Sequence, residues 1–153
     1  MSVAAHPPLP ARPAQSGQIL TFFIFVILAL GLLTAVGLEV GRIVYARAEV
    51  GKAADAAALA AASRVDMALY RETGQVAFLP DASATAQQYA SLNADFLEQR
   101  EIDVSVTQIW IDPGSMVVYV IVSADLSSLL PGFLAWDGRY SVTGFARARI
   151  QGE

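Results

Sequence analysis

The chain has 153 residues, of which 55% are hydrophobic, and a formal net charge of −4 at pH 7. This length allows one domain of ordinary size and a membrane anchor. Between positions 55 and 137 there are eleven acidic residues and three arginines, which argues against a nucleic-acid partner because such partners need clustered lysine and arginine. There is no cysteine, so disulfides and thiolate metal sites are excluded.

Residues 1–17 are rich in alanine and proline and show no apolar periodicity, which predicts a disordered tail. The only histidine, His6, lies in this tail. We interpret it as a solvated residue and not as a metal ligand or a catalytic base.

The next segment, from Ile19 to Leu38, contains no charged residue. Twenty helical residues at about 1.5 Å each span about 30 Å, the thickness of a bilayer core. We therefore predict a transmembrane helix over residues 18–38. A cleaved signal peptide, cut near Ala35-Val36-Gly37, is the alternative. Against it, the run is longer than the usual apolar region of about 7–15 residues, and Arg12 is the only basic residue before it.

No proline interrupts the sequence after the apolar run until Pro80, so we expect the helix to continue to about residue 72, with Gly51 as its weakest point. Eight of the ten residues 53–62 are alanine, the best helix former. The spacing of Leu59, Ala62, Asp66 and Leu69 predicts the face of this helix that packs against a partner.

Two patterns lie where the helix is expected to leave the membrane. Gly37 and Gly41 form a GxxxG pair, which allows close approach of helices in lipid. Glu39, Arg42 and Arg47 follow it. Their side chains either reach toward the membrane surface and pair locally, or set the register between packed subunits.

The rest of the chain predicts a small α+β domain over residues 39–153. Gly74 and the Pro80-Asp81 turn separate the long helix from a second one at about 82–99. We expect its core stripe to consist of Ala86, Tyr89, Leu92 or Asn93, and Phe96.

From residue 103 the pattern changes to that of strands, which we predict at about 103–111, 115–124 and 139–150. The first two are joined by a turn at Asp112-Pro113-Gly114. Alternation in the last strand predicts that one face carries Tyr140, Val142, Gly144, Ala146, Ala148 and Ile150. The strands form a three-stranded antiparallel sheet packed against the helices. An apolar cluster from Leu129 to Trp136 precedes the last strand, in a short helix or loop.

Patterns typical of catalysis or of cofactor binding are missing from the sequence. A nucleophilic triad needs a base such as histidine, and the only lysine, Lys52, follows no glycine-rich phosphate loop. The acidic residues Asp95, Glu98, Glu101 and Asp103 lack the spacing of a calcium-binding loop. We therefore predict no catalytic, cofactor-binding or metal-binding residue, no small-molecule substrate and no enzyme activity.

Residues 16–62 resemble the N-terminal pattern of TadE/TadG-like proteins of the Tad (Flp) pilus assembly system. The matching pieces are SGQ at 16–18, the apolar run, EVGRIVYAR at 39–47 and KAADAAALAAA at 52–62. QQYASLN at 87–93, Pro-Gly-Phe-Leu at 131–134 and the last strand are similar to the C-terminal half of the family. The resemblance implies a bacterial envelope protein with a pilin-like helix, acting as a minor pilin or an assembly component.

The resemblance also implies partner subunits that pack against the N-terminal helix. The small residues predicted to allow this packing are Gly37, Gly41, Ala54, Ala57, Ala58 and Ala61. Arg42, Arg47 and Lys52 follow the apolar run and, by the positive-inside rule, favour a cytoplasmic C-terminus. We follow the resemblance, which places the domain outside the cytoplasm.

Gly17 is the possible processing site that the resemblance implies. Processed relatives carry a glutamate five residues after the cleaved glycine, and Phe22 stands there in this chain. No carboxylate could then pair with the new amine of Gln18, so we expect the chain to stay uncleaved. Two other functions stay open. One is a single-pass envelope protein whose outer domain binds a ligand or partner unrelated to pili, and the other is a membrane-anchored enzyme.

Overall fold

Helix α1 spans Ser16–Ala62 and is the longest element of the computed structural model, which describes residues 16–130 and 138–150. The chain divides into two units, residues 1–36 and residues 37–153, and each is described by itself. In the first unit the described part is α1 up to Val36. In the second unit, α1 continues over residues 37–62, and we call this segment the domain part of α1.

The first unit contains residues 19–36 of the apolar run, and its side chains are exposed along almost the whole helix. The hydroxyl groups of its two threonines donate hydrogen bonds to backbone carbonyl oxygens four residues earlier. Thr21 Oγ1 donates to the carbonyl of Gly17 at 3.0 Å, and Thr34 Oγ1 donates to that of Leu30 at 2.9 Å. Each hydroxyl is therefore satisfied inside the helix, as a lipid environment requires. The helix is long and apolar enough to cross a membrane.

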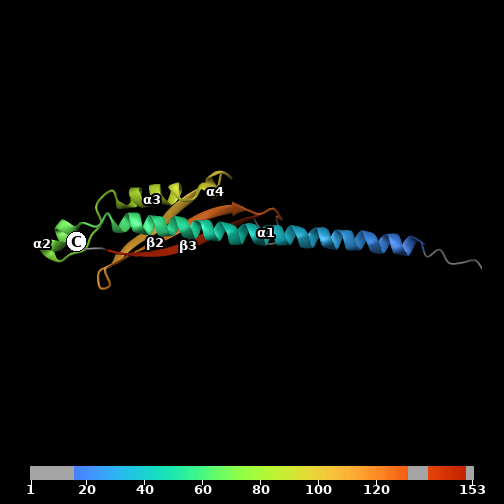
Figure 1. The fold of residues 1–153 in the computed structure, drawn as a ribbon, viewed down its shortest axis with the longest axis horizontal. Helices are drawn as coiled ribbons and strands as arrows, with labels where there is room; N and C mark the ends of the chain where they lie inside the picture. Colours follow the sequence, from blue (N-terminus) through green and yellow to red (C-terminus); the bar gives the residue numbers. More distant parts are fainter. Residues whose placement is uncertain (1–15, 131–137, 151–153) are drawn as a thin grey trace, which may run out of the picture. The chain divides into compact units, whose positions relative to one another are not determined.

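The second unit is built from the domain part of α1, three shorter helices and one sheet (Figure 1). The sequence predicted that the first helix would continue to about residue 72, and this is wrong in one detail. Helix α1 ends at Ala62, and α2 (Met67–Thr73) begins after four intervening residues. In between, the backbone makes other hydrogen bonds: Asp66 N donates to Ala77 O at 2.9 Å, and Leu79 N donates to Arg64 O at 2.8 Å. This pairing with a distant segment removes residues 63–66 from the helix.

Helix α2 has a defined cap at each end. The carboxylate of Asp66 accepts a hydrogen bond from Leu69 N at 2.9 Å. At the other end Gly74 has a φ of 73°, a left-handed conformation that favours glycine, and its N–H donates to Tyr70 O at 2.8 Å. Gly74 therefore ends α2, as the sequence predicted for the end of the long helix.

The predicted second helix consists of α3 (Ala82–Leu92) and a single turn, α4 (Asp95–Glu98). The predicted core stripe is wrong at Tyr89 and Leu92, which are 47% and 62% exposed. In α3 the buried positions are alanines four apart on one helix face, Ala82, Ala86 and Ala90, and in α4 the buried side chain is Leu97. The small side chains allow α3 to lie close to the rest of the second unit, and its bulkier residues Tyr89 and Leu92 are exposed.

The sheet has three antiparallel strands in the order β1-β2-β3: Val104–Asp112, Val117–Ser127 and Arg139–Arg149. All three predicted strands are present, with ends that differ by up to three residues. Strand β1 carries an irregularity between Val106 and Gln108. The predicted α+β fold with a three-stranded antiparallel sheet is confirmed.

One face of the sheet is buried against the domain part of α1 and against α3 and α4. The last strand alternates as predicted, with Val142, Gly144, Ala146, Ala148 and Ile150 buried. The alanines of α1 belong to the same core cluster. The closest approach is at Gly144, where a Cβ atom would lie 2.6 Å from the carbonyl oxygen of Val50. The backbones of α1 and β3 are therefore in direct contact where the two elements cross.

Asp112 organises the turn between β1 and β2. Its carboxylate accepts hydrogen bonds from Gly114 N at 3.0 Å and from Ser115 Oγ at 2.5 Å. These two donors favour the ionised carboxylate and lower the pKa of Asp112 from its ordinary value of 3.8. The turn is therefore held by a charged side chain and not by proline and glycine alone.

This pKa predicts how the turn responds to acid. Because the pKa is lower when folded than when unfolded, the carboxylate stabilises the turn at pH values above the unfolded pKa. That stabilisation is lost as the pH falls below 3.8 and through the lower folded pKa. We expect exchange of the Gly114 amide hydrogen, corrected for its intrinsic pH dependence, to accelerate over this range. Asp112→Asn should remove the acid-dependent part, and an unchanged acid response in that variant would contradict the assignment.

Candidate functional site

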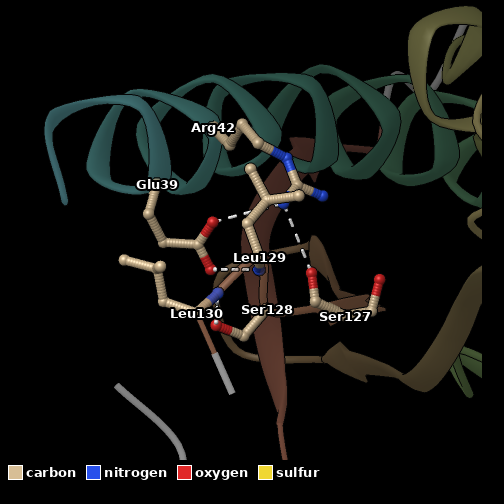
Figure 2. Close-up of polar contacts among 6 residues, drawn as sticks. All are labelled: Glu39, Arg42, Ser127, Ser128, Leu129 and Leu130. Carbon is tan, nitrogen blue, oxygen red and sulfur yellow. Dashed lines mark hydrogen bonds and ion pairs between the residues drawn. The ribbon is translucent and has the colours of Figure 1, made fainter. Parts of the chain in front are cut away.

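The first charged residue after the apolar run, Glu39, joins α1 to the end of β2. Its Oε2 atom lies 3.2 Å from Nη1 of Arg42, one turn along the helix. Its Oε1 atom accepts a hydrogen bond from the backbone N–H of Leu129 at 3.1 Å, and Arg42 Nη1 lies 3.4 Å from the carbonyl oxygen of Ser127 (Figure 2). We call these four residues the Glu39 clasp. It connects segments 85 to 90 residues apart in sequence.

The Glu39 side chain is completely buried, whereas that of Arg42 keeps 22% of its surface exposed. A buried carboxylate is costly unless it is paired and hydrogen-bonded, and here both oxygens have a partner. The hydroxyl of Tyr140 is buried nearby and has no hydrogen-bond partner among the described residues. Burial and the negative charge of Glu39 raise the pKa of Tyr140, although the positive charge of Arg42 acts in the opposite direction.

The clasp predicts a measurable loss of stability. Glu39→Ala leaves the N–H of Leu129 without its acceptor and removes the ion pair with Arg42. We expect the free energy of unfolding to fall by about 2 kcal/mol, measured by urea denaturation of the full chain in detergent micelles.

Glu49→Ala is the matched control, because Glu49 and Lys52 form a second pair three residues apart in α1, at 2.6 Å. Lys52 is largely exposed, and its hydrogen bond to Glu49 raises the pKa of Lys52. Among the described residues, Glu49 makes no side-chain hydrogen bond to a distant segment. We expect a smaller loss there. Equal losses in the two variants would mean that the bond to Leu129 adds nothing.

The predicted processing and packing glycines are all exposed. A Cβ atom added at Gly17, Gly37 or Gly41 would meet nothing within 4 Å. These three residues are therefore not required by packing inside the described chain. Their predicted roles, processing at Gly17 and helix packing at Gly37 and Gly41, stay predictions.

The alanines predicted to pack against a partner subunit lie in the core of the second unit. Ala54, Ala57, Ala58 and Ala61 are 0% exposed and belong to the core of the second unit. From the sequence, these small side chains were predicted to contact a second subunit. In the structure they pack in one core with the chain's own sheet and helices. Leu59, expected on the packed face of the helix, is 68% exposed. In the domain part of α1, the alanines and not the leucine mark the buried face.

An exposed aromatic cluster lies on the other face of the sheet, and the sequence analysis did not single it out. Trp110, Tyr119 and Phe145 come one from each strand, with ring centroids 5.2 to 6.3 Å apart. Phe145 is 60% exposed. Phe145 falls on the face of the last strand opposite to that of Val142 and Ala146, and an aromatic residue on this face was the signal available in the sequence.

An open groove of about 800 Å³ lies between α3 and β1. Its lining contains no titratable side chain, and its main polar residue is Gln87. Both amide atoms of Gln87 already bind the edge strand: Nε2 donates to Val104 O at 2.8 Å, and Oε1 accepts from Val106 N at 2.7 Å. Gln87 thus covers part of the free edge of β1, and the groove offers no arrangement of acid and base.

Across residues 16–130 and 138–150 no group of three or more histidine, aspartate or glutamate side chains could hold a metal ion. One apolar helix, long enough to cross a membrane, continues into a small α+β domain. Directly after the apolar run, the buried carboxylate of Glu39 accepts a hydrogen bond from Leu129 of that domain.

The family model described as "Putative Flp pilus-assembly TadE/G-like" matches residues 17–64. The matched segment contains the apolar run, both residues of the Glu39–Arg42 pair and the alanine block. Comparisons with curated proteins and with solved structures found no match. The resemblance seen in the sequence is confirmed over residues 17–64, and this match covers less than half of the chain.

Proposed function

We propose that this chain is a minor pilin-like or assembly component of a Tad (Flp)-type pilus, anchored in the bacterial cytoplasmic membrane. The observation that carries this proposal is the TadE/G-like match, because it covers the apolar run and the helix segment beneath the sheet together. An assembly role needs no catalytic group, and the described site contains none of the usual arrangements.

The proposed partners are other pilus or assembly subunits, and the proposed contact is the N-terminal helix at Gly37 and Gly41. Both glycines are exposed, and a Cβ atom added at either one would meet no atom of the described residues within 4 Å. Close helix packing in lipid depends on such small residues. Larger residues there should therefore hinder association without disturbing the domain.

Deletion of the gene, followed by complementation, tests this role. We expect surface pili, counted by electron microscopy, to be lost on deletion and restored by the wild-type chain. A chain with Gly37→Leu and Gly41→Leu should not restore them. Gly31→Leu is the control, because Gly31 is also exposed in the same helix but lies outside the pair. Normal piliation after deletion would contradict the proposal and favour an envelope domain unrelated to pili.

The proposed orientation has the C-terminal domain outside the cytoplasm, with the apolar run uncleaved. A reporter enzyme that is active only in the periplasm should be active when fused after the last residue. The intact mass of the protein from its native membrane should show no loss beyond the initiator methionine. A start at Gln18 would show processing at Gly17, and a start at Leu38 would contradict the anchored arrangement.

A further inference from the structure

The end of β2 and the residues that follow it, Ser127–Leu130, are tied to α1 at one place. Glu39 accepts a hydrogen bond from Leu129 N, and Arg42 donates to the carbonyl oxygen of Ser127. The hydroxyl of Ser128 accepts a hydrogen bond from Leu130 N at 3.1 Å, which shapes the backbone locally. We call Ser127–Leu130 the clasped turn.

The clasped turn lies where the apolar run ends. Glu39 directly follows Leu38, the last residue of the uncharged run that begins at Ile19. Because a helix rises about 1.5 Å per residue, the backbone of Glu39 is within about 2 Å of that end. Leu129 N, 3.1 Å from the Glu39 carboxylate, is therefore close to the same level along the helix. In a membrane this level is the boundary between hydrocarbon and headgroups.

Apolar side chains are exposed at this level on both segments. Leu129 is 58% exposed, and Leu38, on the helix, is 62% exposed. In Figure 2 the side chain of Leu130 extends toward the end of the drawn helix that carries Glu39, which is the direction of the apolar run. Leu129 and Leu38 are thus two exposed leucines near the same level, on segments about 90 residues apart in sequence.

We propose that the clasped turn is a second lipid contact of this protein, and that Glu39 holds it at the membrane surface. The proposal rests on the membrane anchor of the proposed function. Lipid is the expected partner because Leu129 is exposed close to the level of Leu38, where the uncharged run ends. Arg42 fits the same place, since its aliphatic stem can lie along apolar surface while its charged group reaches the headgroups.

The consequence is a domain attached to the membrane at two points. A domain that hangs from one helix is free to tilt about the point where the helix leaves the bilayer. A second contact from the end of β2 restricts that tilt and fixes which face of the sheet is turned away from the membrane. Such a restriction lowers the orientational freedom that neighbouring subunits would otherwise have to remove when they pack.

Site-directed labelling tests the proposal, because the chain has no cysteine. Leu129→Cys in the full chain is labelled with an environment-sensitive fluorophore and reconstituted in vesicles of phosphatidylcholine and phosphatidylglycerol. Ser115→Cys is the control, since Ser115 is exposed and lies in the turn at the other end of β2. We expect blue-shifted emission at position 129, and severalfold stronger quenching there by lipids with a nitroxide near the headgroup. Equal, water-like emission at the two positions would overturn the proposal.

Two further measurements separate the possible causes. If shielding at position 129 disappears when the lipid-to-protein ratio is raised tenfold, a second copy of the chain covers the turn, and the lipid assignment is wrong. A label at Leu28→Cys, within the apolar run, should be quenched by nitroxide placed deep in the bilayer. Without that quenching the chain is not inserted, and the anchor itself fails together with the proposal.

The role of Glu39 has its own test in the same vesicles. Glu39→Ala should lower the quenching at position 129 toward that of the control at position 115, while the label at position 28 stays quenched. Unchanged quenching at position 129 in this variant would show that the turn reaches the lipid without the clasp, which contradicts the part assigned to Glu39.

Discussion

Replacing Ala57 with glutamate is expected to unfold the domain of residues 37–150, and not merely to weaken its association with other subunits. The Ala57 side chain is 0% exposed in the core cluster. Glutamate there would place a carboxylate among apolar side chains without a partner and would also overfill a close-packed site. An unpaired buried charge alone lowers the free energy of unfolding by more than about 3 kcal/mol.

Leu59→Glu is the matched control, since residue 59 is two positions away in the same helix and is 68% exposed. We expect its denaturation midpoint to stay close to that of the wild type. Both variants are measured as the full chain in detergent by urea denaturation, followed by near-ultraviolet circular dichroism. If Ala57→Glu retained the wild-type midpoint but lost assembly, the alanine face would be an interface between subunits and the burial described above would not apply.

Gly144→Val is the second substitution with a large expected effect. A Cβ atom at this position would lie 2.6 Å from the carbonyl oxygen of Val50, 2.9 Å from its carbonyl carbon and 3.1 Å from Gly51 N. All three are backbone atoms of α1, so no flexible side chain can move aside. The helix and the strand would have to separate, and we expect a loss of about 3 kcal/mol in the free energy of unfolding.

Gly51→Ala, on the helix side of the same crossing, is expected to act in the opposite direction. A Cβ atom there meets nothing within 4 Å, and alanine is preferred over glycine inside a helix by about 1 kcal/mol. The wild type and the two variants are compared by the same denaturation experiment. A destabilised Gly51→Ala, or a Gly144→Val as stable as the wild type, would mean that α1 and β3 cross less closely than described.

The apolar run and the strands could be predicted from the sequence because each depends on a short-range pattern. When a single segment of twenty uncharged residues crosses lipid, its backbone N–H and C=O groups find hydrogen-bond partners within a helix. Alternation in the last strand gave the buried face of β3 because successive side chains point to opposite sides of a sheet. The helix faces were predicted less well. Tyr89, Leu92 and Leu59 were expected inside because they are large and apolar, and all three are exposed.

The sequence by itself determined that an uncharged helix is followed by helical and then strand-forming segments, and it determined the resemblance to TadE/G-like proteins. The tertiary structure decided which side chains those helices bury. Alanine is compatible with either a core or a surface, and only the close approach of α1 to β3 at Gly144 makes the alanine face a core. The tertiary structure also decided the partner of Glu39, because a hydrogen bond to a backbone N–H 90 residues away leaves no pattern in local sequence.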